Sequence, residues 1–291
     1  MKRILLIGST GQLGKELQQT LAPKGDIIAV GRPTIDLTQL DSLRRVMRLV
    51  QPDLAINVAA YTAVDKAESE PELAKAINAI APIILAQEAQ QLGATLIHIS
   101  TDYVFDGNQS HPYRENNQTN PLSVYGQTKL AGEQAIREQW PHYLILRTSW
   151  VYGTYGKSNF VKTMLRLGAE REEIRVVADQ IGSPTWAGDL AQAIAQIIAT
   201  AEIAGTYHYT NSGVASWYDF AVAIFEEAHQ LGFPLKVQRV IPITTADYPT
   251  AAQRPAYSVL SCEKISSVLG TPPPHWRQGL RKMLAEYAYT C

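Results

Sequence analysis

The first half of the chain alternates short apolar runs with amphipathic stretches, and this alternation restricts the fold more than any other feature of the sequence. Five runs are apolar along nearly their whole length, as expected of strands buried on both faces: residues 3–8, 26–31, 53–60, 95–100 and 143–149. Between them lie four stretches with helical spacing of apolar residues: 12–22, 38–50, 71–93 and 121–139. Strands that alternate with helices in this way predict an α/β fold, a doubly wound parallel sheet of Rossmann type.

The second half is less regular and predicts a smaller lobe. Helices are expected at 159–168, 188–201, 216–232 and 278–290, and strands at 174–179 and 205–210. A Pro-rich stretch with no predicted element precedes the last helix. We therefore expect residues 1–155 to form one domain to which a segment near 188–213 returns, and residues 156–187 and 214–291 to form the smaller C-terminal lobe.

Charge and cysteine content exclude several classes of protein. The net charge of −1 predicts no nucleic-acid or anionic-membrane partner, and no apolar run is long enough to span a bilayer. The apolar N-terminal run leads directly into a Gly-rich turn, which is typical of a first strand and not of a signal peptide. The two cysteines, Cys262 and Cys291, are interpreted as free thiols in a reducing compartment. Together these features predict a cytoplasmic protein.

A glycine triplet lies between the first predicted strand and the first predicted helix. Gly8, Gly11 and Gly14 form G-x-x-G-x-x-G, and glycines here allow the backbone to approach a pyrophosphate at a helix N-terminus. The alternative is a plain Gly-rich turn. Its place after a strand and before a helix favours a dinucleotide-binding turn, and hence an N-terminal dinucleotide-binding domain.

The end of the second predicted strand bears on which dinucleotide is used. Gly31 has no carboxylate for a ribose 2′-hydroxyl, whereas Arg32 could pair with a 2′-phosphate. NADPH is therefore favoured over NADH. The alternative interpretation of Arg32 is a solvated surface arginine.

Tyr125 and Lys129 lie four residues apart in a predicted helix and therefore on the same face. A nearby ammonium would favour the phenolate and bring the tyrosine pKa down toward neutral pH, where it could transfer protons. Thr101 follows the predicted strand at 95–100 and could bond a carbonyl oxygen beside the tyrosine. These three groups are the predicted catalytic residues of a hydride-transfer enzyme.

Several stretches together resemble the dTDP-4-dehydrorhamnose reductases, a family of the extended short-chain dehydrogenase/reductase superfamily. They are "GSTGQLGKEL", "NVAAYTAVDKAESEPE", "STDYVFDG", "PLSVYGQTKLAGE", "RTSWVYG", "NFVKTMLRL", "GSPTWAGDLA", "WYDFA" and "RP" at 254–255. The resemblance implies hydride transfer from NADPH to C4 of dTDP-4-dehydro-β-L-rhamnose, with a proton from Tyr125. It also implies that Lys129 tunes Tyr125 and binds the cofactor ribose. The product would be dTDP-β-L-rhamnose, used for cell-surface polysaccharide.

The resemblance also implies further ligand contacts. Those with the cofactor are Gln12, Leu13, Asp36, Leu37, Ala60, Tyr61 and Thr62, and those with the substrate are Thr101, Asp102 and Trp150. Arg254 could meet a pyrophosphate or could be structural. Some members of the family are dimers with interfacial Mg²⁺, and the matching positions here are Glu16, Asp189 and Glu286; the alternative is three surface carboxylates. A monomer and a homodimer both stay open.

Two other functions remain in competition with this hypothesis. One is another nucleotide-sugar reductase or an epimerase on the same fold. The other is a non-catalytic, NADP-binding regulatory subunit, as in a relative that binds methionine adenosyltransferase.

His98, inside a predicted strand, is interpreted as a core histidine without a role. The charge run at Asp65, Lys66, Glu68 and Glu70 is interpreted as a solvated helix start.

Overall fold

The computed structural model describes residues 2–32, 34–199 and 204–289. The ends of the helices predicted at 188–201 and 278–290, and Cys291, lie outside these ranges. Within the described ranges, no helix is both long and apolar enough to cross a membrane.

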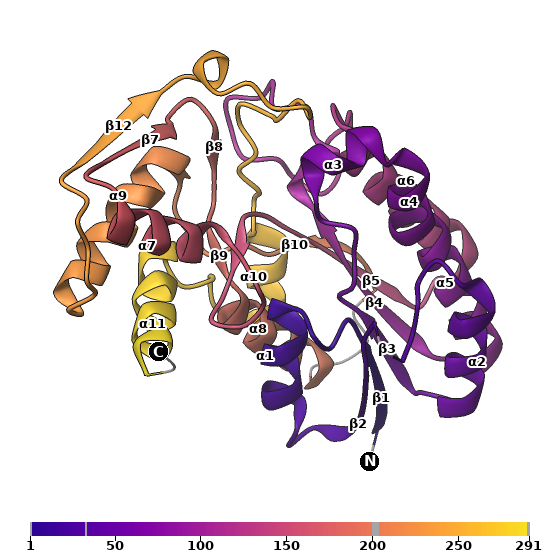
Figure 1. Ribbon diagram of the computed structural model, residues 1–291. Coiled ribbons are helices and arrows are strands. Elements are labelled where there is room, and N and C mark those ends of the chain that lie inside the picture. The colour runs from indigo at the N-terminus through magenta and orange to yellow at the C-terminus, as the bar shows by residue number, and fades with distance from the viewer. Residues whose placement is uncertain (1, 33, 200–203, 290–291) are drawn as a thin grey trace.

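A six-stranded parallel sheet forms the centre of the larger part of the molecule (Figure 1). Its order is β10-β5-β4-β3-β1-β2. The strands are β1 (Lys2–Ile7), β2 (Gly25–Val30), β3 (Leu54–Asn57), β4 (Thr95–Thr101), β5 (Tyr143–Thr148) and β10 (Gly205–His208). The reversal of strand order between β1 and β3 places a crevice at the carboxyl ends of these strands, where ligands of such folds bind. The predicted doubly wound α/β fold is confirmed.

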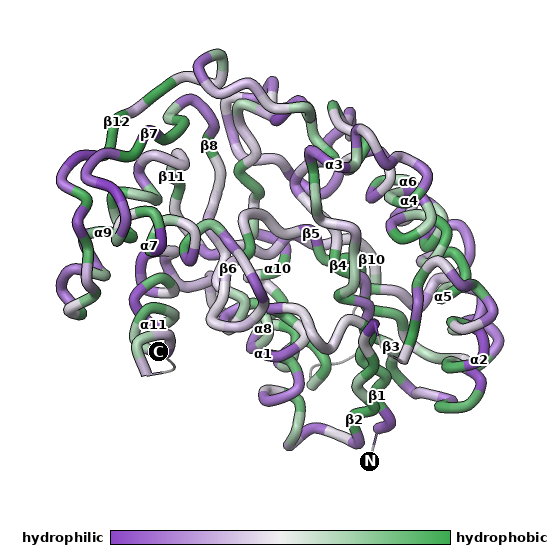
Figure 2. Tube along the Cα trace, viewed as in Figure 1, coloured by the Kyte–Doolittle hydropathy of each residue, from purple (hydrophilic) through white to green (hydrophobic). Residues whose placement is uncertain are grey.

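Helices cover both faces of this sheet because their apolar stripes and the sheet's apolar side chains are buried together. On one face α1 (Gln12–Leu21) packs against α8 (Ala187–Ala199), and on the other α5 (Ala81–Leu92) packs between α2 (Leu40–Val50) and α6 (Val124–Gln139). The hydrophobic colouring of β1 and β3 in Figure 2 marks two inner strands of the sheet, which lie between these two apolar layers.

A second apolar cluster lies among the C-terminal elements at the left of Figure 1. The longer elements around it are α7 (Phe160–Glu170), β7 (Glu173–Val177), α9 (Trp217–Gln230), β12 (Arg239–Ile243) and α11 (Trp276–Ala288). Short pairs join β6 (Val151–Tyr152) to β9 (Thr185–Trp186) and β8 (Ile181–Gly182) to β11 (Ala215–Ser216). Strand β12 lies in the stretch for which the sequence predicted no element, and it pairs with β7. The division of the chain near residue 155 stays a prediction.

Three predicted elements differ from the observed ones in ways that matter for the site, and one observed helix was not predicted. The helix predicted at 71–93 is continuous but contains a π turn, Ala76–Ile80, between α4 (Pro71–Lys75) and α5. The strand predicted at 53–60 ends at Asn57, and α3 (Val64–Ser69) follows it. Helix α6 begins at Val124, three residues later than predicted, because Ser123 caps it by accepting a bond from the Gly126 amide at 3.2 Å. A helix not expected, α10 (Glu263–Leu269), packs on α8 and β10.

Candidate active site

The glycine turn after β1 is held in place by close backbone contacts. Gly8 has φ of +94°, and a Cβ there would lie 2.7 Å from the Ala59 nitrogen. A Cβ on Gly14 would lie 2.1 Å from the Gly8 carbonyl oxygen. Neither position accepts another residue, so β1, the turn and the segment after β3 can approach each other only with glycine.

The N-terminus of α1 opens at this turn without a side-chain cap. Gly11 is the N-cap residue and is exposed, so the first amide groups of the helix remain able to meet an anion. Gln12 accepts a bond from Asn159 Nδ2 at 2.7 Å, which links the turn to the start of α7. Leu13 is 7% exposed and packs in the core between the sheet and α8, so its contact is mainly with the protein interior.

The segment after β2 presents polar groups at the surface. Arg32 and Asp36 are exposed. Hydrogen bonds from Thr38 hold the pKa of Asp36 below its ordinary value, and the positive charge of Arg32 makes a smaller contribution in the same direction. Leu37 is half-buried against the core on the α2 side of the sheet. A side chain at Gly31 would crowd Thr10, whose Cγ2 lies 2.9 Å from the Cβ position.

The loop after β3 is fixed by the π turn. Asn78 accepts the Tyr61 amide at 2.8 Å and donates to the Tyr61 carbonyl at 3.1 Å. The Tyr61 side chain is 9% exposed, packs beside Tyr125 and donates its hydroxyl to Glu70. Ala60 is half-buried and Thr62 exposed, so both lie at the open side of this loop.

Tyr125 lies beside Thr101 because α6 approaches the end of β4 very closely. A Cβ on Gly126 would lie 2.2 Å from the Tyr103 carbonyl, so glycine permits this approach. Burial raises the pKa of Tyr125 to about 12; a hydrogen bond with Thr101 lowers it and the charge of Asp102 raises it. The shift is opposite to the one expected from the Tyr-x-x-x-Lys spacing, because burial outweighs the local stabilisation of the phenolate.

Asp102 is 2% exposed and lies directly after β4. Thr101 donates to its Oδ1 at 3.1 Å, whereas Oδ2 has no hydrogen-bond partner among the described residues. Burial raises the pKa of Asp102 to about 6, with hydrogen bonds from Ser258 and Thr101 opposing the shift. An unsatisfied buried carboxylate beside Tyr125 is typical of a ligand-binding site.

Lys129 is 1% exposed and its amine turns toward β4. Its Nζ donates to the Ile99 carbonyl at 2.6 Å and lies 3.2 Å from His98 Nε2. Burial lowers the lysine pKa to about 8, and the charge of Glu133 opposes that shift. Tyr125 and Lys129 thus share one helix face as predicted, but the lysine amine contacts the strand below.

Trp150 follows β5 in a left-handed backbone conformation, with φ of +47°. Its ring stacks on Trp217 of α9 at a centroid distance of 3.5 Å and an angle of 7°. It also lies against Gly182, where a Cβ would meet the indole at 2.6 Å. A non-glycine residue held at positive φ is unusual, and such strain is concentrated at ligand sites.

Arg254 forms a paired ion bridge with Asp65, at 3.0 and 2.7 Å. It also bonds Tyr103, so it links its own loop to the start of α3 and to the turn after β4. The interpretation of the charge run at 65–70 as solvated is therefore wrong for three of its members. Besides Asp65, Glu68 accepts the Val124 amide at 2.9 Å and Glu70 accepts the Tyr61 hydroxyl. These carboxylates are half-buried and shape the rim of the site.

The three carboxylates proposed for Mg²⁺ do not form a cluster. In the described part of the chain, no group of three His, Cys, Asp or Glu side chains converges in a way that could hold a metal. Asp189 is paired with Asn211 at 2.8 Å and Lys282 at 3.4 Å. Glu16 is buried, and burial followed by the charge of Glu286 raises its pKa to about 7. The metal hypothesis is not supported by this arrangement, since Asp189 already has a cationic partner.

Some residues of the site were not found from the sequence. Trp217 lies on it, and Asn57 and His98 lie beneath Lys129. A usable signal existed for the last two, because each is a polar residue inside an otherwise apolar predicted strand. Their pairing across β3 and β4 could not be read from one sequence, because register is set by non-local packing.

A Rossmann-type sheet, a glycine turn at its switch point and a Tyr-x-x-x-Lys helix beside a threonine define the class of the extended short-chain dehydrogenase/reductases. The family model described as "RmlD substrate binding domain" matches residues 1–289. The chain is 47% identical over 291 residues to the dTDP-4-dehydrorhamnose reductase of Escherichia coli K12, covering 97% of each. The chain belongs to the family of dTDP-4-dehydrorhamnose reductases.

Solved structures agree with this assignment. The crystal structure of dTDP-4-dehydrorhamnose reductase from Bacillus anthracis in complex with NADP has a TM-score of 0.92 and 43% identity, covering 98% of this chain and 99% of that one. A UDP-glucose 4-epimerase from Thermus thermophilus in complex with NAD has a TM-score of 0.81 at 19% identity, covering 99% of this chain and 100% of that one. The second likeness shows the shared fold alone.

Proposed function

We propose that the chain reduces the 4-keto group of dTDP-4-dehydro-β-L-rhamnose to dTDP-β-L-rhamnose with NADPH, the last step of dTDP-L-rhamnose biosynthesis. The family membership supports this reaction. The observation that carries it is the contact between the Thr101 and Tyr125 side chains at the carboxyl edge of the sheet. That edge also carries the glycine turn, so a dinucleotide and a carbonyl group could meet beside one phenol.

The turn and its neighbours fit a dinucleotide. The tight contacts of Gly8 and Gly14 leave a backbone cradle, and the exposed amide end of α1 beyond Gly11 suits a pyrophosphate. We assign further cofactor contacts to Gln12, Leu13, Arg32, Asp36, Leu37, Ala60, Tyr61 and Thr62. The exposed Arg32 beside a crowded Gly31 supports NADPH over NADH. The bound nicotinamide supplies the hydride.

Tyr125 supplies the proton in this proposal. Because its pKa lies near 12, the phenol is protonated at neutral pH and can donate to the oxygen that gains negative charge during reduction. Thr101 holds that oxygen beside the phenol. Lys129 stabilises the phenolate that remains and binds the ribose, which requires its amine to turn from β4 toward Tyr125.

We assign sugar-nucleotide contacts to Thr101, Asp102 and Trp150. The unpartnered Asp102 oxygen supports a hydrogen bond from a sugar hydroxyl. The stacked Trp217 covers one face of Trp150, which supports contact through the exposed edge of the indole. Arg254 holds Asp65, and we assign it a structural role at the rim in addition to any contact with a pyrophosphate.

The test is NADPH oxidation followed by absorbance, with the 4-keto sugar made in situ by the preceding enzymes. Turnover that is nearly lost in Tyr125→Phe supports the proposal. No turnover by a folded, NADPH-binding protein would contradict it and would favour the regulatory-subunit alternative. An epimerase would convert a sugar nucleotide without net NADPH consumption.

Sedimentation of the same preparation, with and without a chelator, separates a monomer, a homodimer and a metal-dependent dimer. We place the reaction in the cytoplasm, a proposal that the unbridged Cys262 supports.

A further inference from the structure

Beneath Lys129 lies a chain of buried polar groups that the proposed reaction does not use. The Ala59 amide donates to Asn57 Oδ1 at 3.1 Å, and Asn57 Nδ2 lies 3.1 Å from His98 Nδ1. His98 Nε2 lies 3.2 Å from Lys129 Nζ. Asn57, His98 and Lys129 are each at most 1% exposed, so water does not replace these bonds.

This chain has a direction, which its first member sets. The Ala59 amide can only donate, so the Asn57 oxygen must face it and the Asn57 NH₂ group must face His98. His98 Nδ1 therefore accepts. Burial holds the pKa of His98 well below its ordinary value, so the ring is neutral and its single proton lies on Nε2. That N–H points at the lysine nitrogen.

A charged lysine would leave this arrangement with two donors facing each other. An ammonium has no lone pair, so it cannot accept from His98 Nε2–H. If the His98 proton moved to Nδ1, that N–H would face the Asn57 NH₂ group, and two donors would again meet. If Asn57 flipped, its NH₂ group would face the Ala59 amide. Each alternative loses one buried hydrogen bond, whereas a neutral amine accepts from His98 and still donates to the Ile99 carbonyl.

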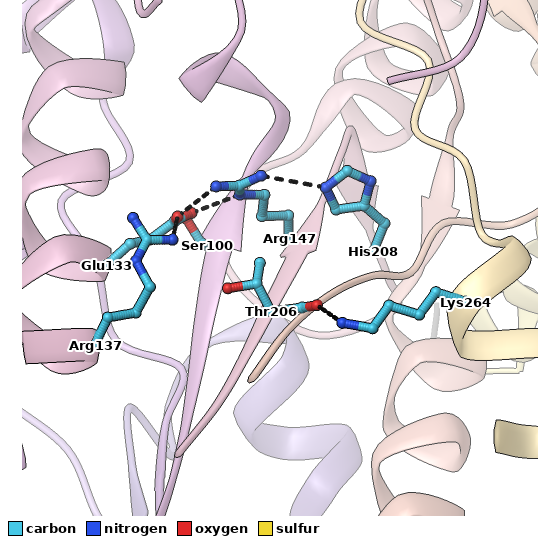
Figure 3. Close-up of polar contacts among 7 residues, drawn as sticks. All are labelled: Ser100, Glu133, Arg137, Arg147, Thr206, His208 and Lys264. Atoms are coloured by element: carbon cyan, nitrogen blue, oxygen red, sulfur yellow. Dashed lines mark hydrogen bonds and ion pairs between the residues drawn. The ribbon is translucent and has the colours of Figure 1, made fainter. Parts of the chain in front are cut away.

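The carboxylate one turn along the helix does not offset this. Glu133 is the acidic group that acts on Lys129 from α6, but its oxygens are taken by other partners (Figure 3). Arg147 of β5 holds Glu133 Oε1 at 2.9 Å and Oε2 at 2.7 Å, and Ser100 of β4 donates to Oε1 at 2.5 Å. Arg137 adds a second positive charge at 3.3 Å. The negative charge of Glu133 is thus balanced locally. Tyr125, the remaining titratable neighbour on α6, is neutral at pH 7 to 9 because its pKa is raised to about 12.

We propose that Asn57 and His98 are positioning residues that favour the neutral amine form of Lys129, through the hydrogen-bond chain that begins at the Ala59 amide. The lysine takes up a proton readily only when it leaves His98. The consequence for catalysis rests on the proposed function: activity that depends on the Lys129 ammonium declines as pH rises through about 8.

The first test needs no ligand. ¹⁵N NMR of histidine-labelled, full-length protein identifies which ring nitrogen of His98 carries the proton, with His98→Gln used for assignment. A proton on Nε2 is expected at pH 9, where Lys129 is mostly the neutral amine. A proton on Nδ1, or a doubly protonated ring, would overturn the proposal.

The second test follows the charge of Lys129 itself. Lysine is labelled at Cε, and the Lys129 resonance is assigned by its absence in Lys129→Met. Its titration midpoint is expected near pH 8 in the unmodified protein. In His98→Gln, whose side-chain oxygen can accept from an ammonium, the midpoint should rise by about one pH unit. Asn57→Asp should raise it as well, because aspartate accepts from both Ala59 and a His98 Nδ1–H.

The matched control is His208→Gln. His208 is also a fully buried, neutral histidine, with its pKa lowered to about 3, but it contacts Arg147 and the Tyr113 carbonyl. Its replacement should leave the Lys129 midpoint in place. Equal midpoints in the unmodified protein and in both chain variants would contradict the proposal, as would a lysine that stays charged to pH 10. Both NMR readouts are obtained without cofactor or substrate, so they stand whether or not the protein reduces the proposed sugar.

Discussion

Helix α6 carries two buried ionisable regions one turn apart, and they are built in opposite ways. Around Glu133, both carboxylate oxygens are bonded, to Arg147, Ser100 and Arg137. Around Tyr125 and Lys129, the tyrosine is half-buried and the lysine is buried, and both pKa values are displaced toward the neutral forms. Full pairing makes the first region a structural joint between α6, β4 and β5. Incomplete pairing keeps the second ready for a ligand.

The largest effect is expected at the incompletely paired region. Tyr125→Phe should lower kcat by about 10³-fold, because the proton donor is lost. The free energy of unfolding should change by no more than about 1 kcal/mol, since one hydrogen bond to Thr101 is removed. Steady-state NADPH oxidation and urea unfolding measure the two effects. Appreciable residual turnover would mean that the proton comes from another group.

The fully paired region should respond in stability instead. Glu133→Leu leaves the buried Arg147 without its carboxylate and should reduce the free energy of unfolding by about 3–5 kcal/mol. The double change Glu133→Leu with Arg147→Met should restore most of that loss, because no buried charge is left unpaired. Urea unfolding of the single and double variants decides the matter. A single variant as stable as the parent would show that the pair contributes nothing to the fold.

Thr101 on β4 and Thr148 on β5 are register partners, and replacing each in turn tests whether Thr101 has a specific effect on Tyr125. Thr101→Val removes the hydrogen bond that lowers the Tyr125 pKa, so the phenol becomes a weaker acid and kcat/KM should fall about 10-fold. Thr148, its register partner, has a buried hydroxyl without a partner among the described residues. Thr148→Val should therefore leave kcat/KM unchanged, and equal losses in both variants would remove the special role of Thr101.

The smallest effect is expected at Glu16, a buried carboxylate for which the described residues provide no arginine partner like those of Glu133. Its Oε1 has no hydrogen-bond partner in the described ranges, and its pKa is raised from 4.5 to about 7. The folded protein then holds a proton that the unfolded chain releases, so this group reduces stability as pH rises from about 4.5 to 7. Glu16→Gln should raise the urea midpoint at pH 8 and leave it unchanged at pH 4. A difference of equal size at both pH values would exclude this explanation.

The sequence was sufficient where the physics is local. Apolar runs and helical spacing predicted the parallel sheet and its covering helices, and the four-residue spacing placed Tyr125 and Lys129 on one face. It failed where contacts are distant in the chain. The pairing of β12 with β7, the Arg254–Asp65 bridge and the Asn57–His98 contact each join residues more than 40 apart. The predicted direction of the Tyr125 pKa shift was wrong for a similar reason, because the dominant cause is burial, which depends on the whole fold.

One feature of the topology bears on how the protein is made. Strand β10 completes the sheet beside β5, and α8 covers the face that α1 shares, although both elements come more than thirty residues after β5 in the chain. A nascent chain that has emerged only to Thr148 therefore has an unpaired sheet edge and bare apolar side chains such as Leu144 and Leu146. Such intermediates attract one another and chaperones. The first half of the molecule can finish folding only after the ribosome has passed His208.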